Sequence, residues 1–105
     1  MKDVTITTVD GALVISVPRE FSVDLIHHAW APDIIASYPG PYRELRFDLS
    51  RCGLLTSGFI SQIFQLQEAF KRGGALAVLD RPDPRFVKVL ETVGIRSLFQ
   101  VVERT

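Results

Sequence analysis

The chain has 105 residues, of which 47% are hydrophobic and 23% charged, a balance typical of a globular domain and too apolar for intrinsic disorder. Its 12 basic and 12 acidic side chains cancel, which argues against a nucleic-acid partner, since such binding draws on an excess of positive charge. The single cysteine, Cys52, excludes an internal disulfide, and no uncharged run approaches the about 20 residues of a membrane span. We therefore expect one domain over residues 1–105, in the cytoplasm, without direct membrane insertion.

The first elements are two short β-branched runs, residues 4–9 and 12–17, separated by Asp10-Gly11. An Asp-Gly pair between such runs predicts a β-hairpin, because both turn positions need positive φ. Ser22 is an expected N-cap for a helix that reaches Trp30. Pro32 either kinks that helix or starts a second, short one.

A third strand is predicted over residues 44–49, where apolar and polar side chains alternate strictly. The alternation predicts one buried face and one wetter face. Apolar residues then recur at helical spacing from Phe59 to Phe70, and Gly73-Gly74 ends the pattern.

The last third of the chain predicts strand, helix and strand. Residues 75–79 form a short apolar strand of the buried type. Asp83 as N-cap, Pro84 in the first turn and Gly94 after the last turn bracket a helix. A final strand is expected over residues 98–102. The expected core face of the helix consists of Phe86, Val87, Val89, Leu90 and Val93.

These elements follow one another in the order β-β-α-β-α-β-α-β. Helical crossovers between the later strands imply parallel connections, so the fold class is α/β with a single mixed sheet of about five strands. The polar face of the strand at 44–49 predicts that the helices lie mainly on one side of this sheet.

Few residues of this sequence are candidates for catalysis or metal binding. Neighbouring residues of a helix point about 100° apart, so His27 and His28 cannot chelate one metal without other ligands. Cys52 has no partner nearby in sequence and is interpreted as a small, partly buried apolar residue. Arg81 to Arg85 turn the chain and cap a helix. We expect no enzyme, metal or cofactor.

The stretch from Leu54 to Phe59 places two hydroxyls and a glycine at the start of the most amphipathic helix. Thr56 or Ser57 could simply cap this helix. Alternatively, the free amides and the positive helix end favour a phosphate on one of these hydroxyls. About two added negative charges would disrupt an interface fitted to a neutral hydroxyl.

The order and spacing of four segments resemble the STAS domain, the fold of bacterial anti-sigma factor antagonists of the SpoIIAA type. The resemblance is best from Leu45 to Val102. Its segments are Phe47-Asp48-Leu49-Ser50, Ser57-Gly58, Lys71-Arg72-Gly73-Gly74, and Val93-Gly94-Ile95 through Phe99.

In that family the loop usually reads Asp-Ser-Ser/Thr-Gly, and a kinase that is also the anti-sigma factor phosphorylates its hydroxyl. Anchored on Gly58 with one residue fewer in the loop, the resemblance makes Thr56 the phospho-acceptor and puts Leu55 at the usual acid. Without that gap, Ser57 becomes the acceptor and Thr56 replaces the acid. In both registers the acid is missing, and Pro18-Arg19-Glu20-Phe21 replaces the family's Gly-Glu-Leu-Asp segment.

The resemblance implies a non-catalytic, protein-binding regulator. Its partner would be an anti-sigma factor, a serine kinase of the histidine-kinase-like type, and phosphorylation would switch binding off. The alternative is a small STAS subunit that binds and stabilises an ABC-type transporter ATPase. A domain of a larger sensory scaffold and a weak homodimer are further hypotheses. The expected contact residues are Leu55, Thr56, Ser57, Gly58 and Phe59.

Overall fold

A computed structural model describes residues 4–18, 30–52 and 57–103. One five-stranded sheet with the strand order β1-β2-β3-β4-β5 forms the base of the molecule. β1 and β2 are antiparallel, and the other neighbours are parallel. The strands are β1 (Thr5–Val9), β2 (Ala12–Ser16), β3 (Glu44–Asp48), β4 (Leu76–Asp80) and β5 (Gln100–Val102).

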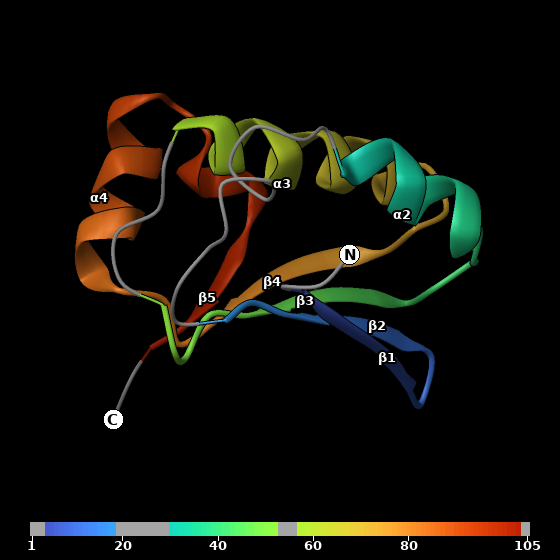
Figure 1. Ribbon diagram of the computed structural model, residues 1–105. Coiled ribbons are helices and arrows are strands. Elements are labelled where there is room, and N and C mark those ends of the chain that lie inside the picture. Colours follow the sequence, from blue (N-terminus) through green and yellow to red (C-terminus); the bar gives the residue numbers. More distant parts are fainter. Residues whose placement is uncertain (1–3, 19–29, 53–56, 104–105) are drawn as a thin grey trace.

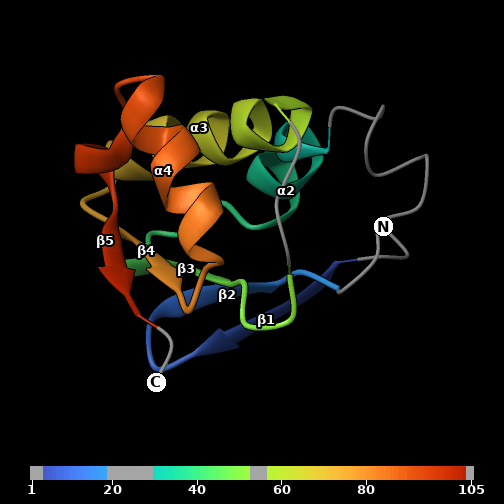
Figure 2. The ribbon, with the colours of Figure 1, turned by 90° about the vertical axis from the view of Figure 1, so that its left-hand side faces the viewer.

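The helices lie together on one face of this sheet (Figures 1 and 2). They are α2 (Ala31–Ser37), α3 (Ser57–Lys71) and α4 (Pro84–Thr92), followed by the 3-10 turn η1 (Arg96–Leu98). The α/β class, the single mixed sheet and the one-sided arrangement of helices are confirmed. Within the described part of the chain, no helix is both long and apolar enough to cross a membrane.

The β1–β2 hairpin turns at Asp10-Gly11, as predicted. Asp10 has φ 48° and Gly11 has φ 81°, the positive values that this tight turn requires. Val9 and Ala12 face each other across the turn and fix the register of the two strands.

The two faces of the sheet differ as the alternation in β3 predicts. Leu45 and Phe47 point toward the helices and are at most 1% exposed. Glu44, Arg46 and Asp48 lie on the helix-free face and are partly exposed. The core between sheet and helices has its largest fully buried side chains in Trp30, Phe47, Phe86, Leu13, Ile15, Ile34, Leu45, Leu49, Ile63, Leu66, Leu79 and Leu90.

Both ends of α4 are as predicted, but its core face is narrower. The Asp83 side chain accepts a hydrogen bond from the Arg85 amide at 2.9 Å, and Gly94 follows the helix with φ 82°. Phe86 and Leu90 are fully buried, whereas Val93 is 54% exposed. The expectation for Val93 is wrong because Val93 lies at the helix end, beyond the last turn that faces the sheet.

Pro32 lies in the first turn of α2, which begins at Ala31, so the second of the two alternatives for this proline is confirmed. Two boundaries in the last third of the chain differ from the sequence-based expectation. The Leu98 amide donates to the Ile95 carbonyl, so residues 96–98 form a 3-10 turn and the last strand begins at Gln100. β4 begins one residue late, and its first residue, Leu76, is 50% exposed on the helix-free face. The predicted segment at 22–29, with His27 and His28, lies outside the described residues.

Candidate functional site

The candidate site lies at the edge of the sheet where β2, β3 and β4 all end, because parallel strands place their carboxyl ends on the same side. From this edge β3 leads toward α3, and β4 leads into α4 through Arg81 to Asp83. The ends of β3 and β4 therefore lie next to each other on the molecule.

Charged side chains cross-link the strand ends on the helix-free face. Asp48 and Asp80 are opposite each other in the β3–β4 register. The Arg81 side chain lies 3.1 Å from the Asp80 carboxylate and 3.9 Å from that of Asp48. Arg46 lies 3.3 Å from Asp80 and 2.8 Å from Glu44. The arginines thus offset the repulsion between the neighbouring aspartates and fix the positions of the two strand ends.

Asp48 is also hydrogen-bonded to the first residue after Leu49 in the β3–α3 junction. Its carboxylate accepts from the Ser50 hydroxyl at 2.6 Å and from the Ser50 amide at 3.1 Å. Partial burial opposes ionisation, but these hydrogen bonds and the nearby Arg81 and Arg51 charges outweigh it and lower the pKa of Asp48. Asp48 therefore acts as an ionised anchor for the start of the junction.

Cys52 anchors the junction from the core side. It is 3% exposed, and its thiol donates weakly to the Val17 carbonyl at 3.5 Å and the Pro18 carbonyl at 3.4 Å. Cys52 was predicted to be a small, partly buried residue, and its burial is more complete than that. A buried thiol that donates to backbone carbonyls is placed for packing rather than for nucleophilic chemistry.

The start of α3 is anchored by aromatic packing. The Phe59 ring is 4% exposed and lies against the fully buried Trp30, with ring centroids 5.4 Å apart. Gln62, one turn further on, accepts a hydrogen bond from the Ala31 amide at 2.8 Å and so ties α3 to the start of α2. Buried residues thus hold the chain on both sides of residues 53–56.

The first turn of α3 carries no acidic residue, and no charged residue precedes Glu68 in this helix. A helix start bears partial positive charge from its unpaired amides. Since no carboxylate of the helix offsets that charge, the start of α3 is favourable for an added anion such as a phosphate on a nearby hydroxyl.

The five predicted contact residues differ in whether the structure describes them and in how exposed they are. Leu55 and Thr56 lie outside the described residues. Ser57 is the first residue of α3, and Gly58 beside it is exposed. Phe59 requires a correction: its ring belongs to the core, so it positions the helix start and does not present its side chain to a partner.

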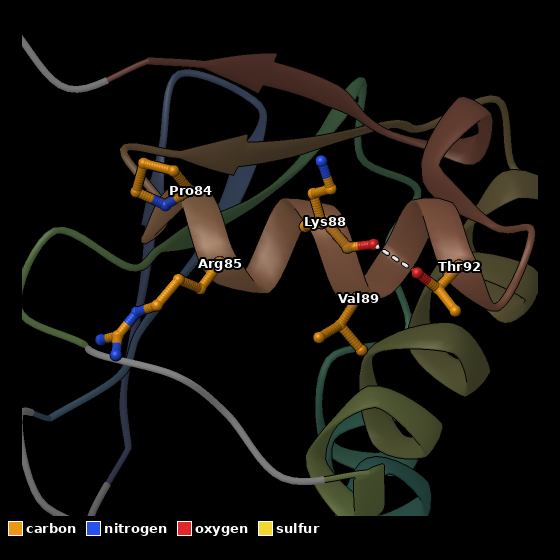
Figure 3. A pocket seen from close by; sticks show the side chains of 5 residues that line it. All are labelled: Pro84, Arg85, Lys88, Val89 and Thr92. Atoms are coloured by element: carbon orange, nitrogen blue, oxygen red, sulfur yellow. Dashed lines mark hydrogen bonds between the residues drawn. The ribbon is translucent and has the colours of Figure 1, made fainter.

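Among residues 4–18, 30–52 and 57–103, no group of three or more His, Cys, Asp or Glu side chains could hold a metal ion. A groove runs along the outer side of α4 (Figure 3), with a cavity volume of about 440 Å³. Two of its polar side chains are engaged at α4 itself: Thr92 donates to the Lys88 carbonyl, and Arg85 pairs with the capping Asp83. The Lys88 ammonium alone does not supply the convergent polar groups that orient a small ligand. It is lined by Pro84, Arg85, Lys88, Val89 and Thr92.

Sequence reasoning missed the cluster of Arg46, Asp48, Asp80 and Arg81, and also the Gln62 link to α2. The cluster had a usable signal: two strands that each end in aspartate become neighbours once they are paired in parallel register. Gln62 had none, because its partner is a backbone amide 31 positions away.

Solved structures similar to this chain include proteins described as anti-sigma factor antagonists. The crystal structure of a candidate anti-sigma factor antagonist from Thermotoga maritima, TM1081, matches with a TM-score of 0.79 at 14% identity, over 96% of this chain and 86% of that one. An NMR structure of TM1081 matches with a TM-score of 0.77 at 14% identity, over 93% and 78%. The unphosphorylated anti-sigma factor antagonist SpoIIAA matches with a TM-score of 0.74 at 15% identity, over 96% and 89%.

The chain has the STAS fold of SpoIIAA. No family model matches the chain, and no curated protein matches it by sequence. The STAS fold predicted from the order of the segments is thus confirmed by structure, at an identity too low to carry function with it.

Proposed function

We propose that the chain is a non-catalytic regulatory module, an anti-sigma factor antagonist that acts in the cytoplasm. The start of α3 docks an anti-sigma factor of the kinase type, through Leu55, Thr56, Ser57 and Gly58. The observation that carries this proposal is the helix start itself: it lies in the helix layer at the end of the molecule where β3 and β4 end (Figure 1), is anchored by buried Phe59, and has an uncharged first turn.

Rigid anchors favour docking, because a preorganised surface loses little conformational freedom on binding. Cys52 is buried before the loop and Phe59 after it, so the intervening residues can contact a partner while the scaffold stays fixed. The Phe59 ring faces Trp30, and Gly58 beside it is exposed. Because Gly58 has no side chain, a partner's backbone can approach closely there.

Phosphorylation of Thr56, or of Ser57 in the second register, is the proposed off switch. A phosphate carries about −1.5 to −2 charges at neutral pH and is stabilised near a helix start. The modified chain would therefore remain folded while its interface becomes charged. Leu55 at the family's acidic position means that the kinase must recognise a loop without that carboxylate.

The test is capture of partners from the native lysate by the tagged chain, with Thr56→Asp, Ser57→Asp and the neutral Thr56→Val and Ser57→Asn in parallel. We expect an anti-sigma factor kinase in the wild-type and neutral samples, and its loss with aspartate at the true acceptor. If both aspartate variants recover as much of the kinase as the wild-type chain does, the switch is contradicted. Absence of any anti-sigma factor from the wild-type sample would contradict the proposed partner.

The second candidate is a small subunit of an ABC-type transporter that stabilises its ATPase by contact. The uncharged first turn of α3 favours it, together with Leu55 at the acidic position, because both suit a neutral, constitutive interface. Capture of an ATPase, unaffected by phosphatase treatment of the lysate, would support this candidate over the first.

A further inference from the structure

The sheet has one long edge, formed by β1, whose composition is unusual for an exposed strand. β1 pairs only with β2 among the described residues, and its five residues read Thr-Ile-Thr-Thr-Val. All five are β-branched and none is charged. Exposed edges normally carry lysine, proline or a bulge, which prevent pairing with another chain. β1 has none of these.

The direction of its backbone groups follows from the hydrogen bonds of β2. The Val17 amide donates to the Asp48 backbone carbonyl, and the Gly11 carbonyl accepts from the Arg43 amide, so the backbone groups of the odd-numbered residues of β2 point toward β3. Backbone groups alternate along a strand, hence Ala12, Val14 and Ser16 point toward β1.

The β1 residues opposite them are Val9, Thr7 and Thr5, so these three bond to β2. The amides and carbonyls of Ile6 and Thr8 therefore point away from β2, toward the open edge of the sheet.

We propose that β1 pairs with β1 of a second copy, antiparallel and centred on Thr7. In this register Ile6 of each copy exchanges both backbone hydrogen bonds with Thr8 of the other. Thr7 lies opposite itself at the two-fold axis, and Thr5 lies opposite Val9. The partner is a second copy because two antiparallel β1 strands are related by a two-fold axis, so that each offers to the other the same backbone groups that it needs. In this pairing no charged residue lies opposite another.

Charge at the level of the whole molecule also permits the contact. The formal net charge is zero, so two copies approach without overall repulsion. Val9 is 53% exposed and would lose part of that exposure against Thr5 of the second copy. The pairing joins two sheets into one and, since the two-fold axis is perpendicular to the sheet, leaves the helices of both copies on the same side.

Sedimentation equilibrium tests the association directly. A contact of one short strand is smaller than a stable interface, so we expect the average mass of the full chain to rise toward twice the monomer value between about 10 µM and 1 mM. Thr8→Pro removes an amide that faces the open edge and should abolish this rise. Thr8→Ser, which keeps the amide, should retain it. A wild-type chain that stays monomeric to about 1 mM, or a folded Thr8→Pro chain that associates equally, overturns the proposal.

The register is tested by cysteine pairing with the oxidant diamide. Directly opposed residues of a non-hydrogen-bonded pair have Cα atoms about 4.5 Å apart, within disulfide range. Thr7→Cys should therefore cross-link at least tenfold faster than Thr5→Cys, which is exposed on the same face but opposes Val9. Equal rates would overturn the Thr7-centred register. Both variants keep the open-edge amides, so this test remains valid where Thr8→Pro fails to fold.

Discussion

The helices that follow β3 and β4 are stabilised at their starts in different ways. At the β4–α4 junction, the Asp83 side chain caps the helix at 2.9 Å and pairs with Arg85 at 2.7 Å. At the β3–α3 junction, the first turn of the helix contains no acidic residue, and its position is fixed by Phe59 against Trp30.

In this fold, one helix start serves stability and the other is left available for binding. A carboxylate at a helix start satisfies amides and offsets their charge, which leaves little for an external anion or partner to gain. The α4 junction uses its carboxylate in this way, whereas the α3 junction draws its stability from buried rings and keeps its first turn neutral. The α3 start is therefore the better candidate for a surface that phosphorylation can change.

The largest expected effect comes from removing the aromatic anchor of α3. Trp30→Ala should lower the free energy of unfolding by about 3–5 kcal/mol, because a fully buried large ring that packs on Phe59 is lost. Trp30→Phe should cost less, since it keeps a ring and removes an indole N–H that has no hydrogen-bond partner among the described residues. Urea unfolding measures both, and a loss below about 1 kcal/mol for Trp30→Ala would refute the anchoring role.

A charge in the first turn of α3 should move stability and binding in opposite directions. Ser57→Asp should stabilise the helix by about 0.3–1 kcal/mol through the helix dipole. It should also weaken binding of the captured partner at least about tenfold, or about 1.4 kcal/mol, because the interface is fitted to a neutral turn. Ser57→Asn is the neutral control, and calorimetric titration with thermal unfolding reports both quantities. Unchanged affinity would show that the first turn lies outside the interface.

Removing the charge at the start of α4 should change the stability of the fold without changing partner affinity. Asp83→Ala removes the cap and its pair with Arg85, and we expect a loss of about 1 kcal/mol with no change in partner affinity. Asp83→Ser retains a capping oxygen and should recover most of the loss in urea unfolding. A large fall in affinity for Asp83→Ala would mean that both junctions contact the partner.

The smallest effect concerns Asp48 and acid stability. Its pKa is lowered in the folded chain below the ordinary value of 3.8, so its contribution is present above that value and is lost as pH falls through the folded pKa. Asp48→Asn should therefore unfold with a shallower dependence on pH in the acid range, below about pH 4. Denaturant midpoints at several acidic pH values measure the slope, and an unchanged slope would contradict the assignment.

Much of the fold could be predicted because local signals agreed with tertiary structure. Asp10-Gly11 needed only its own backbone angles to define the hairpin, and Asp83-Pro84 defined the start of α4. Val93 and Leu98 were assigned wrongly, since the chain there turns back toward the sheet and hydrophobic periodicity does not report that turn.

The candidate site was less predictable than the fold. Phe59 was expected to contact a partner because it lies at the start of the helix, and only the packing of Trp30, 29 positions earlier, shows that its ring is buried. The aspartates that support the strand ends become neighbours through register alone. Sequence indicated where the helix begins, whereas long-range contacts determine which of its side chains remain accessible.

An NMR titration shows directly whether the start of α3 is the docking surface. The ¹⁵N-labelled chain is titrated with the captured partner, and amide shift changes are mapped onto the fold. We expect the largest changes at Ser57, Gly58 and the residues just before them, with β1 and the Arg46–Asp80 cluster little affected. Changes confined to the helix-free face or to β1, with the first turn of α3 unperturbed, would contradict docking at this helix start.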